Sequence, residues 1–277
     1  MKLRDSPLGE VSGMSRISPF HLVDISPWPL VASVSGLSVV SGFLSIFYGH
    51  RVFFLFIALG LVFLVCLSWW SDVTRESTYS GFHTKSVQGN LLLRMVWFII
   101  SEVFFFFRFF WTFAHSGFDP IIELRVSWPP VRIRVLDPLG VPLLNTLVLL
   151  SSGFTVTWAH YGLLVREYSS SIRRIIGTII LRAFFTLLQV SEYLESRFNL
   201  SDSSYGSIFF LATGFHGFHV LVRSIFLLIS TIRLISGHFS TSHHVGLECS
   251  IWYWHFVDVV WIFLYLCIYI WRSSPIF

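Results

Sequence analysis

Long apolar runs alternate with short polar stretches along the whole chain. A transmembrane helix needs roughly 20 apolar residues. Runs near that length lie at about 28–47, 53–70, 92–114, 141–163, 174–196, 205–232 and 249–271. A segment in lipid has to make its backbone hydrogen bonds internally, so runs of this kind become helices. The pattern therefore predicts an all-α, polytopic membrane protein with seven transmembrane helices.

The polar stretches divide these spans unevenly. We predict an N-terminal tail over 1–24, a two-helix transmembrane unit over 25–70, an interfacial loop over 71–90 and a five-helix transmembrane bundle over 91–277. A further loop, 117–140, holds Pro120, Pro129, Pro130 and Pro138, which a continuous helix does not tolerate. The expected architecture is two helices followed by five.

Composition agrees with the membrane class. Only 12% of residues are charged and the mean hydropathy is +0.71, whereas a soluble domain carries about 25% charged residues. The three cysteines, Cys66, Cys249 and Cys267, form no CxxC pair, so we expect neither a disulfide framework nor a thiolate metal site. The charged N-terminal tail has no apolar core, so we expect no secretory signal peptide there.

Lysine and arginine in the loops predict the orientation. Nine lie on the N-terminal side of the predicted spans and six on the opposite side. Because positively charged loops stay on the side from which a membrane protein inserts, the bias puts the N-terminus on the positive side.

Ionisable residues inside the apolar runs are the candidates for function, because such groups are costly in lipid. Glu102 lies near the middle of the third span; it is either a proton-relay carboxylate or a neutral glutamate that bonds a neighbouring helix. The other members of this group are His160, Glu192, His216, His219, His255 and Asp258. The spacing of His216 and His219 could chelate a metal, and single histidines could bind haem. No Glu-x-x-His motif is present, so we favour structural hydrogen bonds and no metal.

The loop predicted over 71–90 carries a different kind of candidate. Two tryptophans stand beside alternating charges, which suits a site for a phospholipid headgroup with Arg75 on the phosphate. The alternative is an ordinary aromatic belt with ion pairs inside the loop. The candidate lipid-binding residues are Trp69, Trp70, Arg75, Glu76, His83 and Arg233.

Several motifs follow one another in order over about residues 19–272, without a large gap. They are Phe20-His-Leu-Val-Asp24, Arg75-Glu-Ser-Thr78, Ser101-Glu-Val-Phe104, Val141-Pro-Leu-Leu-Asn-Thr146, Thr155-Val-Thr-Trp-Ala-His160, Ser191-Glu-Tyr193, Thr213-Gly-Phe-His-Gly217 and Trp252-Tyr-Trp-His-Phe-Val-Asp258. Together these motifs resemble subunit III of cytochrome c oxidase, a haem–copper terminal oxidase of mitochondrial type.

The resemblance implies two helices split from five by a lipid-filled cleft, in the mitochondrial inner membrane with the N-terminus on the matrix side. It implies a subunit that is not catalytic by itself, with haem and copper in the partner subunits I and II. The subunit would bind phospholipid and support proton uptake. Glu102 matches the family's membrane-embedded glutamate, and Trp70, Arg75, Glu76, His83 and Arg233 match its lipid positions. A free-standing transporter or metal-dependent membrane enzyme using Glu102 and the histidines is the alternative.

The chain departs from the family pattern in one systematic way. Arginine stands where the family usually has glycine, at Arg94, Arg108, Arg125, Arg132, Arg166, Arg182, Arg223 and Arg272. An arginine in the middle of a span costs about 2.5–3.5 kcal/mol, and we expect no ready acidic partners. Some animal mitochondrial codes read AGA and AGG as glycine, so we predict glycine at these positions. The alternative is genuine arginine that reaches the cleft or pairs with other subunits.

Overall fold

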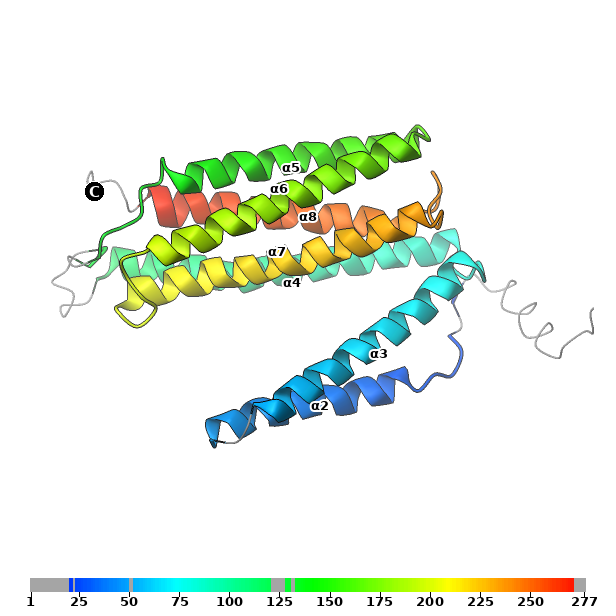
Figure 1. The fold of residues 1–277 in the computed structure, drawn as a ribbon, viewed down its shortest axis with the longest axis horizontal. Coiled ribbons are helices and arrows are strands. Elements are labelled where there is room, and N and C mark those ends of the chain that lie inside the picture. Colours follow the sequence, from blue (N-terminus) through cyan, green and yellow to red (C-terminus); the bar gives the residue numbers. More distant parts are fainter. Residues whose placement is uncertain (1–19, 22, 50–51, 121–127, 131–132, 272–277) are drawn as a thin grey trace, which may run out of the picture. The chain divides into compact units, whose positions relative to one another are not determined.

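The computed structural model describes residues 20–21, 23–49, 52–120, 128–130 and 133–271. These residues form long helices and no strand (Figure 1). Seven of the helices are long and apolar enough to cross a membrane, which confirms the prediction from the hydrophobic pattern. The chain divides into two compact units, Met1–Leu91 and Leu92–Phe277. The lipid-filled cleft between two helices and five stays a prediction.

The first unit is built on the pair α2 (Trp28–Phe47) and α3 (Phe53–Thr78). Proline in the first turn of α2 suits a helix start, where a backbone N–H has no partner to lose. The two helices approach closely at Gly42, where a Cβ atom would lie 3.0 Å from the Cα atom of Leu55. Small residues let helix backbones approach in this way.

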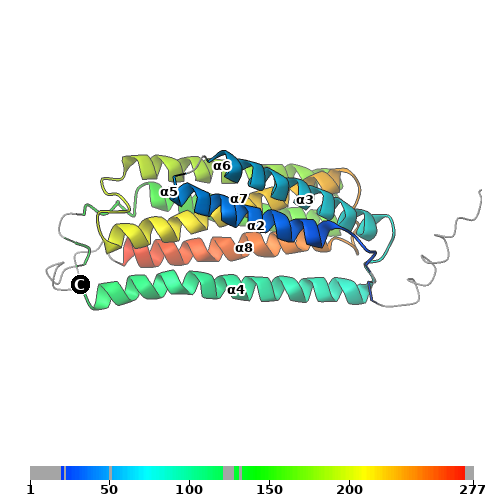
Figure 2. The same cartoon turned by 90° about the horizontal axis from the view of Figure 1, so that it is seen from below.

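The remaining helices follow in chain order. They are α4 (Lys85–Phe118), α5 (Val141–Leu164), α6 (Tyr168–Glu195), α7 (Ser204–Ile235) and α8 (Val245–Leu264), and α8 ends in a π-helical turn, η2 (Tyr265–Ile270). In the second unit, α5 packs on α6 and α8, and α7 also packs on α6 and α8, so these four close into a bundle (Figures 1 and 2). Aromatic pairs such as Phe105–Phe215 and Phe106–Phe256 join α4 to α7 and α8.

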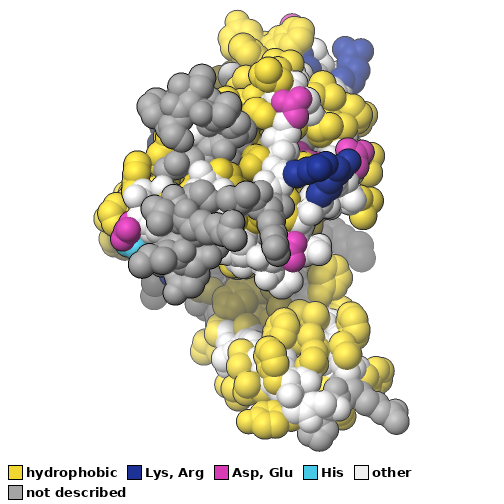
Figure 3. All heavy atoms as spheres, turned by 90° about the vertical axis from the view of Figure 1, so that its left-hand side faces the viewer, with side chains coloured by type: hydrophobic (Ala, Val, Ile, Leu, Met, Phe, Trp, Pro, Cys, Tyr) yellow, Lys and Arg dark blue, Asp and Glu magenta, His cyan; other side chains and the backbone are white. Residues whose placement is uncertain are grey.

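Helix α8 supplies much of the core of the second unit. Trp254 and Trp261, two turns apart, are fully buried, and Leu149 of α5 and Leu227 of α7 are buried as well. Many large hydrophobic side chains are exposed on the outer faces of the helices, and such a surface suits contact with lipid or with another protein. Figure 3 faces the end where α5 begins, where hydrophobic side chains (yellow) are widespread among the described residues and charges lie in a few places.

The predicted interfacial loop is shorter than expected. α3 continues to Thr78 and α4 starts at Lys85, so only residues 79–84 of the predicted loop 71–90 connect the two helices. Likewise α6 starts at Tyr168 rather than near 174. Hydropathy falls where a helix leaves the hydrocarbon region of the membrane, but the helical backbone hydrogen bonds can continue into the polar interface. In α3, the ion pair between Asp72 and Arg75, at i and i+3, stabilises the last turns.

Candidate functional site

Glu102 of α4 and His219 of α7 form a pair inside the second unit. Glu102 Oε2 lies 2.7 Å from His219 Nε2. The imidazole packs against the rings of Phe105 and Phe106, and the Glu102 side chain is only partly exposed. Sequence reasoning singled out both residues, but their 117-residue separation gave no sign that they meet.

The other nitrogen of His219 decides where the protons of this pair lie. His219 Nδ1 lies 2.7 Å from the carbonyl oxygen of Phe215, so Nδ1 carries a hydrogen and donates it. Nε2 and the Glu102 carboxyl then share one proton: either the neutral glutamic acid donates to Nε2, or imidazolium donates to carboxylate. Both forms have no net charge, which lowers the cost of placing two ionisable groups at membrane depth.

The other predicted intramembrane histidines also have polar partners. His216 is fully buried and its Nε2 donates to the carbonyl oxygen of Val257, at 3.3 Å. His255 Nε2 lies 3.1 Å from Thr157 Oγ1. His160 Nε2 lies 3.3 Å from His244 Nε2. Within the described ranges, no group of three or more His, Cys, Asp or Glu side chains could hold a metal ion.

Glu192 belongs to a buried polar cluster on α5, α6 and η2. Tyr269 donates its hydroxyl hydrogen to Glu192 Oε1, at 2.6 Å. Asn145 Nδ2 donates to Gln189 Oε1, at 3.4 Å. One further polar atom on each of Asn145, Gln189 and Glu192 has no partner in the described part of the chain. These three atoms therefore lack the hydrogen bonds that buried polar groups normally make.

Asp258 of α8 lies between two arginines. Its Oδ1 accepts hydrogen bonds from Arg182 Nη2 of α6, at 2.9 Å, and from Arg223 Nη1 of α7, at 2.6 Å. The expectation that the arginines inside spans lack an acidic partner is therefore wrong for these two. The expectation considered only partners three or four residues away on the same helix, whereas the carboxylate of Asp258 comes from a different helix.

The candidates for lipid binding divide between the two units. Arg75 near the end of α3 pairs with Asp72, at 3.2 Å, and Asp72 Oδ2 accepts a hydrogen bond from Trp28 Nε1, at 2.6 Å. Glu76 Oε2 lies 3.3 Å from His21 Nε2. We call Asp72, Arg75, Glu76, His21 and Trp28 the headgroup cluster. Sequence reasoning placed neither His21 nor Trp28 in it, although His21 lies within a motif that carries the family resemblance.

The remaining lipid candidates lie in different surroundings. The ring of His83 meets that of His21 edge to face, with centroids 5.5 Å apart, so His83 borders the headgroup cluster. Trp69 and Trp70 of α3 are both exposed, as expected of an aromatic belt. Arg233 is in the second unit, in the last turn of α7, with its guanidinium 4.6 Å from the ring centre of Phe239.

Comparison with known proteins decides the family. The family Cytochrome c oxidase subunit III matches residues 18–273. Cytochrome c oxidase subunit 3 of Paracentrotus lividus is 49% identical over 260 residues, which are 94% of this chain and 100% of the relative. The proteins of the same name from Heterololigo bleekeri and Drosophila melanogaster are 48% and 49% identical, over 92% and 91% of this chain and 99% and 97% of their own lengths.

The chain belongs to the cytochrome c oxidase subunit III family. The resemblance seen in the sequence is thereby confirmed over nearly the whole chain. As a subunit III, the chain is a multi-pass membrane component of cytochrome c oxidase, which is complex IV of the respiratory chain, and it works together with other oxidase subunits.

Proposed function

We propose that this subunit III is a non-redox component that stabilises the catalytic subunits I and II, binds phospholipid and supports proton uptake. Haem and copper then belong to the partner subunits. The support is that the intramembrane polar side chains find their partners within the chain, as structural groups do. Five of the predicted ones, His160, Glu192, His216, His219 and His255, have such a partner at a residue other than the eight suspect arginines.

The proposed location is the mitochondrial inner membrane, with the N-terminus on the matrix side. The excess of Lys and Arg on the N-terminal side of the spans supports this orientation. If the eight suspect arginines are left out, the counts become eight on that side and three opposite, and the bias is stronger.

The headgroup cluster is the observation that carries the lipid-binding proposal. The Arg75 side chain is 70% exposed, and its ion pair with Asp72 is made through Nη2, so much of the guanidinium is accessible to a ligand. Guanidinium donors bind phosphate oxygens well. Asp72 and Glu76 beside it favour a headgroup that carries an amine as well as a phosphate. Two exposed tryptophans on α3 add support, because tryptophan side chains favour the depth that headgroups occupy.

The first prediction tests this site in the assembled oxidase. Arg75→Ala should lower the amount of phospholipid that co-purifies with the complex, measured by mass spectrometry, and shorten its lifetime during turnover. Arg75→Lys keeps a charge but loses the two-pronged geometry, so its lipid content should be intermediate. Arg134→Ala, at an exposed arginine before α5, is the matched control. An unchanged lipid content in Arg75→Ala would refute the proposed site.

The Glu102–His219 pair is the proposed proton-related group. It holds one transferable proton between Oε2 and Nε2, at a distance that permits transfer within the pair. The Glu102 side chain is 20% exposed, so this proton would exchange with water wherever a water chain reaches the carboxyl group. The pair makes no covalent bond to substrate and transfers no electron, so it acts on proton supply rather than on oxygen reduction.

A further inference from the structure

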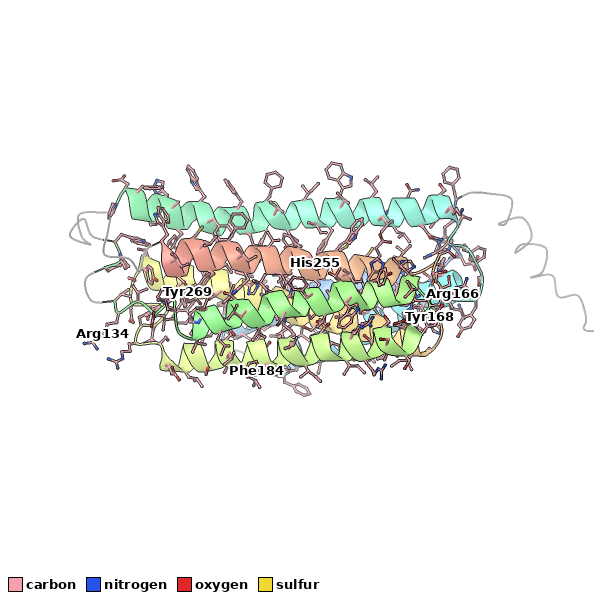
Figure 4. The ribbon with its side chains drawn as sticks, turned by 90° about the horizontal axis from the view of Figure 1, so that it is seen from above. Arg134, Arg166, Tyr168, Phe184, His255 and Tyr269 are labelled. Carbon is pink, nitrogen blue, oxygen red and sulfur yellow. The ribbon has the colours of Figure 1, made fainter. Side chains whose placement is uncertain are left out.

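The turn between α5 and α6 holds an arginine in a backbone conformation that favours glycine. Arg166 has a φ of +64° and is the only non-glycine residue with positive φ among those that the structure describes. Figure 4 labels it at the end of the bundle opposite Arg134 and Tyr269. A side chain in this left-handed region crowds the backbone, which is why glycine normally occupies it.

The hydrogen bonds of this turn show that the conformation is required. Arg166 N–H donates to Leu163 O, at 3.1 Å, and Glu167 N–H donates to Gly162 O, at 2.8 Å. This pair of bonds closes the C-terminus of a helix and needs a left-handed residue just after its end. α7 ends in the same way at Gly237, with a φ of +73°, and α2 ends with a left-handed Gly49. The position of Arg166 is thus one that glycine fills in the other two helices.

Burial gives a second, independent indication at two positions inside spans. Arg182 is 2% exposed and Arg223 is 0% exposed. Two guanidinium cations share a single oxygen of Asp258, and Nε and one terminal nitrogen of each arginine have no partner in the described part of the chain. One carboxylate cannot balance two cations, so the cluster leaves a positive charge buried among Trp254 and Phe185.

This burial also argues against the alternative that lipid headgroups or partner subunits supply the missing hydrogen-bond partners of Arg182 and Arg223. A guanidinium reaches a lipid headgroup or a partner subunit only if part of its side chain is exposed. Arg182 and Arg223 are not, so no partner from outside the chain can take up the remaining N–H groups.

Other arginines of the chain have ordinary surroundings, which makes the contrast informative. Arg75 and Arg174 lie toward helix ends and contact carboxylates, at 3.2 and 3.8 Å. Arg233 lies in the last turn of α7, where the helix dipole favours a cation. Arg108, by contrast, lies deep in the phenylalanine run of α4. Its guanidinium lies over the ring of Phe105, and it makes no ion pair within the described residues.

We infer that the native protein carries glycine at positions 166, 182 and 223, and that the arginines written there come from AGA or AGG codons that the organism reads as glycine. The same codon assignment extends the inference to 94 and 108. Positions 125, 132 and 272 share the sequence pattern but lie outside the described residues. Glycine removes the crowding at position 166. At positions 182 and 223, glycine lets α6, α7 and α8 approach closely around Asp258. Asp258 then keeps His255, one turn earlier on α8, as a polar neighbour.

The gene sequence provides the first test. Positions 166, 182 and 223 should be encoded by AGA or AGG, whereas Arg75, Arg174 and Arg233 should have CGN codons. A CGN codon at any of the first three positions overturns the inference for that position.

Peptide mass spectrometry of the purified native oxidase provides the second test. Chymotryptic peptides that contain positions 166, 182 and 223 should have the mass of glycine there, and peptides that contain Arg174 and Arg233 should have the mass of arginine. Trypsin should cleave after Arg174 but not after 166 or 182. Arginine masses at 166, 182 and 223 would overturn the inference even if the codons are AGA or AGG.

Discussion

At the scale of single residues, Glu102 and His219 show how a polar pair is tolerated at membrane depth. One proton serves the two facing atoms, because the other imidazole nitrogen already donates to the Phe215 carbonyl. A neutral pair avoids most of the penalty of a bare charge in lipid.

The second prediction concerns Glu102. Glu102→Gln keeps a side chain that can hydrogen-bond His219 but removes the transferable proton. Oxygen reduction by the complex should change by less than about tenfold, which corresponds to under about 1.4 kcal/mol in barrier height. Haem and copper content should stay the same, and labelling of this subunit by hydrophobic carbodiimides should disappear. Glu195→Gln, at the end of α6, is the control. Loss of haem or copper from Glu102→Gln would contradict the non-redox role.

The third prediction concerns the conformation at position 166. In a chain synthesised with arginine there under the standard code, Arg166→Gly should stabilise the protein by about 1 kcal/mol, because it relieves the left-handed strain. Arg173→Gly is the matched control: it removes an exposed arginine from the interior of α6 and should destabilise by about 1 kcal/mol. Thermal unfolding of the two purified variants measures both effects. A lower melting temperature for Arg166→Gly than for the unchanged chain would show that arginine stabilises this turn more than glycine does.

At the scale of elements, a buried polar cluster joins the end of α6 to the π-helical turn η2. Glu192 and Tyr269 come from segments 77 residues apart and meet through one 2.6 Å hydrogen bond. Both side chains are buried, so neither can turn to water instead. A contact of this kind holds the last turn of the chain's final span to the rest of the second unit.

The fourth prediction tests this contact. Tyr269→Phe removes one hydroxyl group and leaves Glu192 without its donor, which should cost about 1–3 kcal/mol. Tyr161→Phe, at an exposed tyrosine of α5, should change stability very little. Thermal unfolding of the variants in detergent provides the comparison. The double variant Tyr269→Phe with Glu192→Gln should lose less than the sum of the single changes, because the two groups interact; additive losses would count against the contact.

At the scale of the whole molecule, charge sets the orientation in the membrane. The printed chain has a formal net charge of +4, which becomes −4 without the eight suspect arginines. The remaining Lys and Arg concentrate on the N-terminal side of the spans. A clearer bias of Lys and Arg toward one side is what the positive-inside rule leads us to expect of an inserted protein.

The fifth prediction tests the proposed orientation with trypsin. Arg134 and Arg197 are exposed at one end of the second unit, and Arg173 is exposed toward the other. If the N-terminus faces the matrix, trypsin added to mitochondria without their outer membrane should cleave after Arg134 or Arg197 and spare Arg173. Inverted vesicles should give the opposite result. Peptides from detergent-solubilised oxidase show which of these bonds are cleavable at all. Cleavage at Arg173 in mitochondria without their outer membrane would show that the orientation is the opposite of the proposed one.

The sequence by itself determined the class of protein and the position of every span. Long apolar runs become helices because lipid offers the backbone no other partner, and the family motifs follow in order along the chain. Span ends were less predictable: α3, α4 and α6 extend beyond their apolar parts, since helical hydrogen bonds continue into the polar interface where hydropathy has already fallen.

Only the tertiary structure decided which polar groups meet. Glu102 and His219 are 117 residues apart, and Trp28 and Asp72 are 44 apart, so neither pair follows from a spacing within one helix. Periodicity shows which face of a helix a residue lies on, but the rotation and neighbours of each helix arise from side-chain packing between segments, which a linear pattern does not contain.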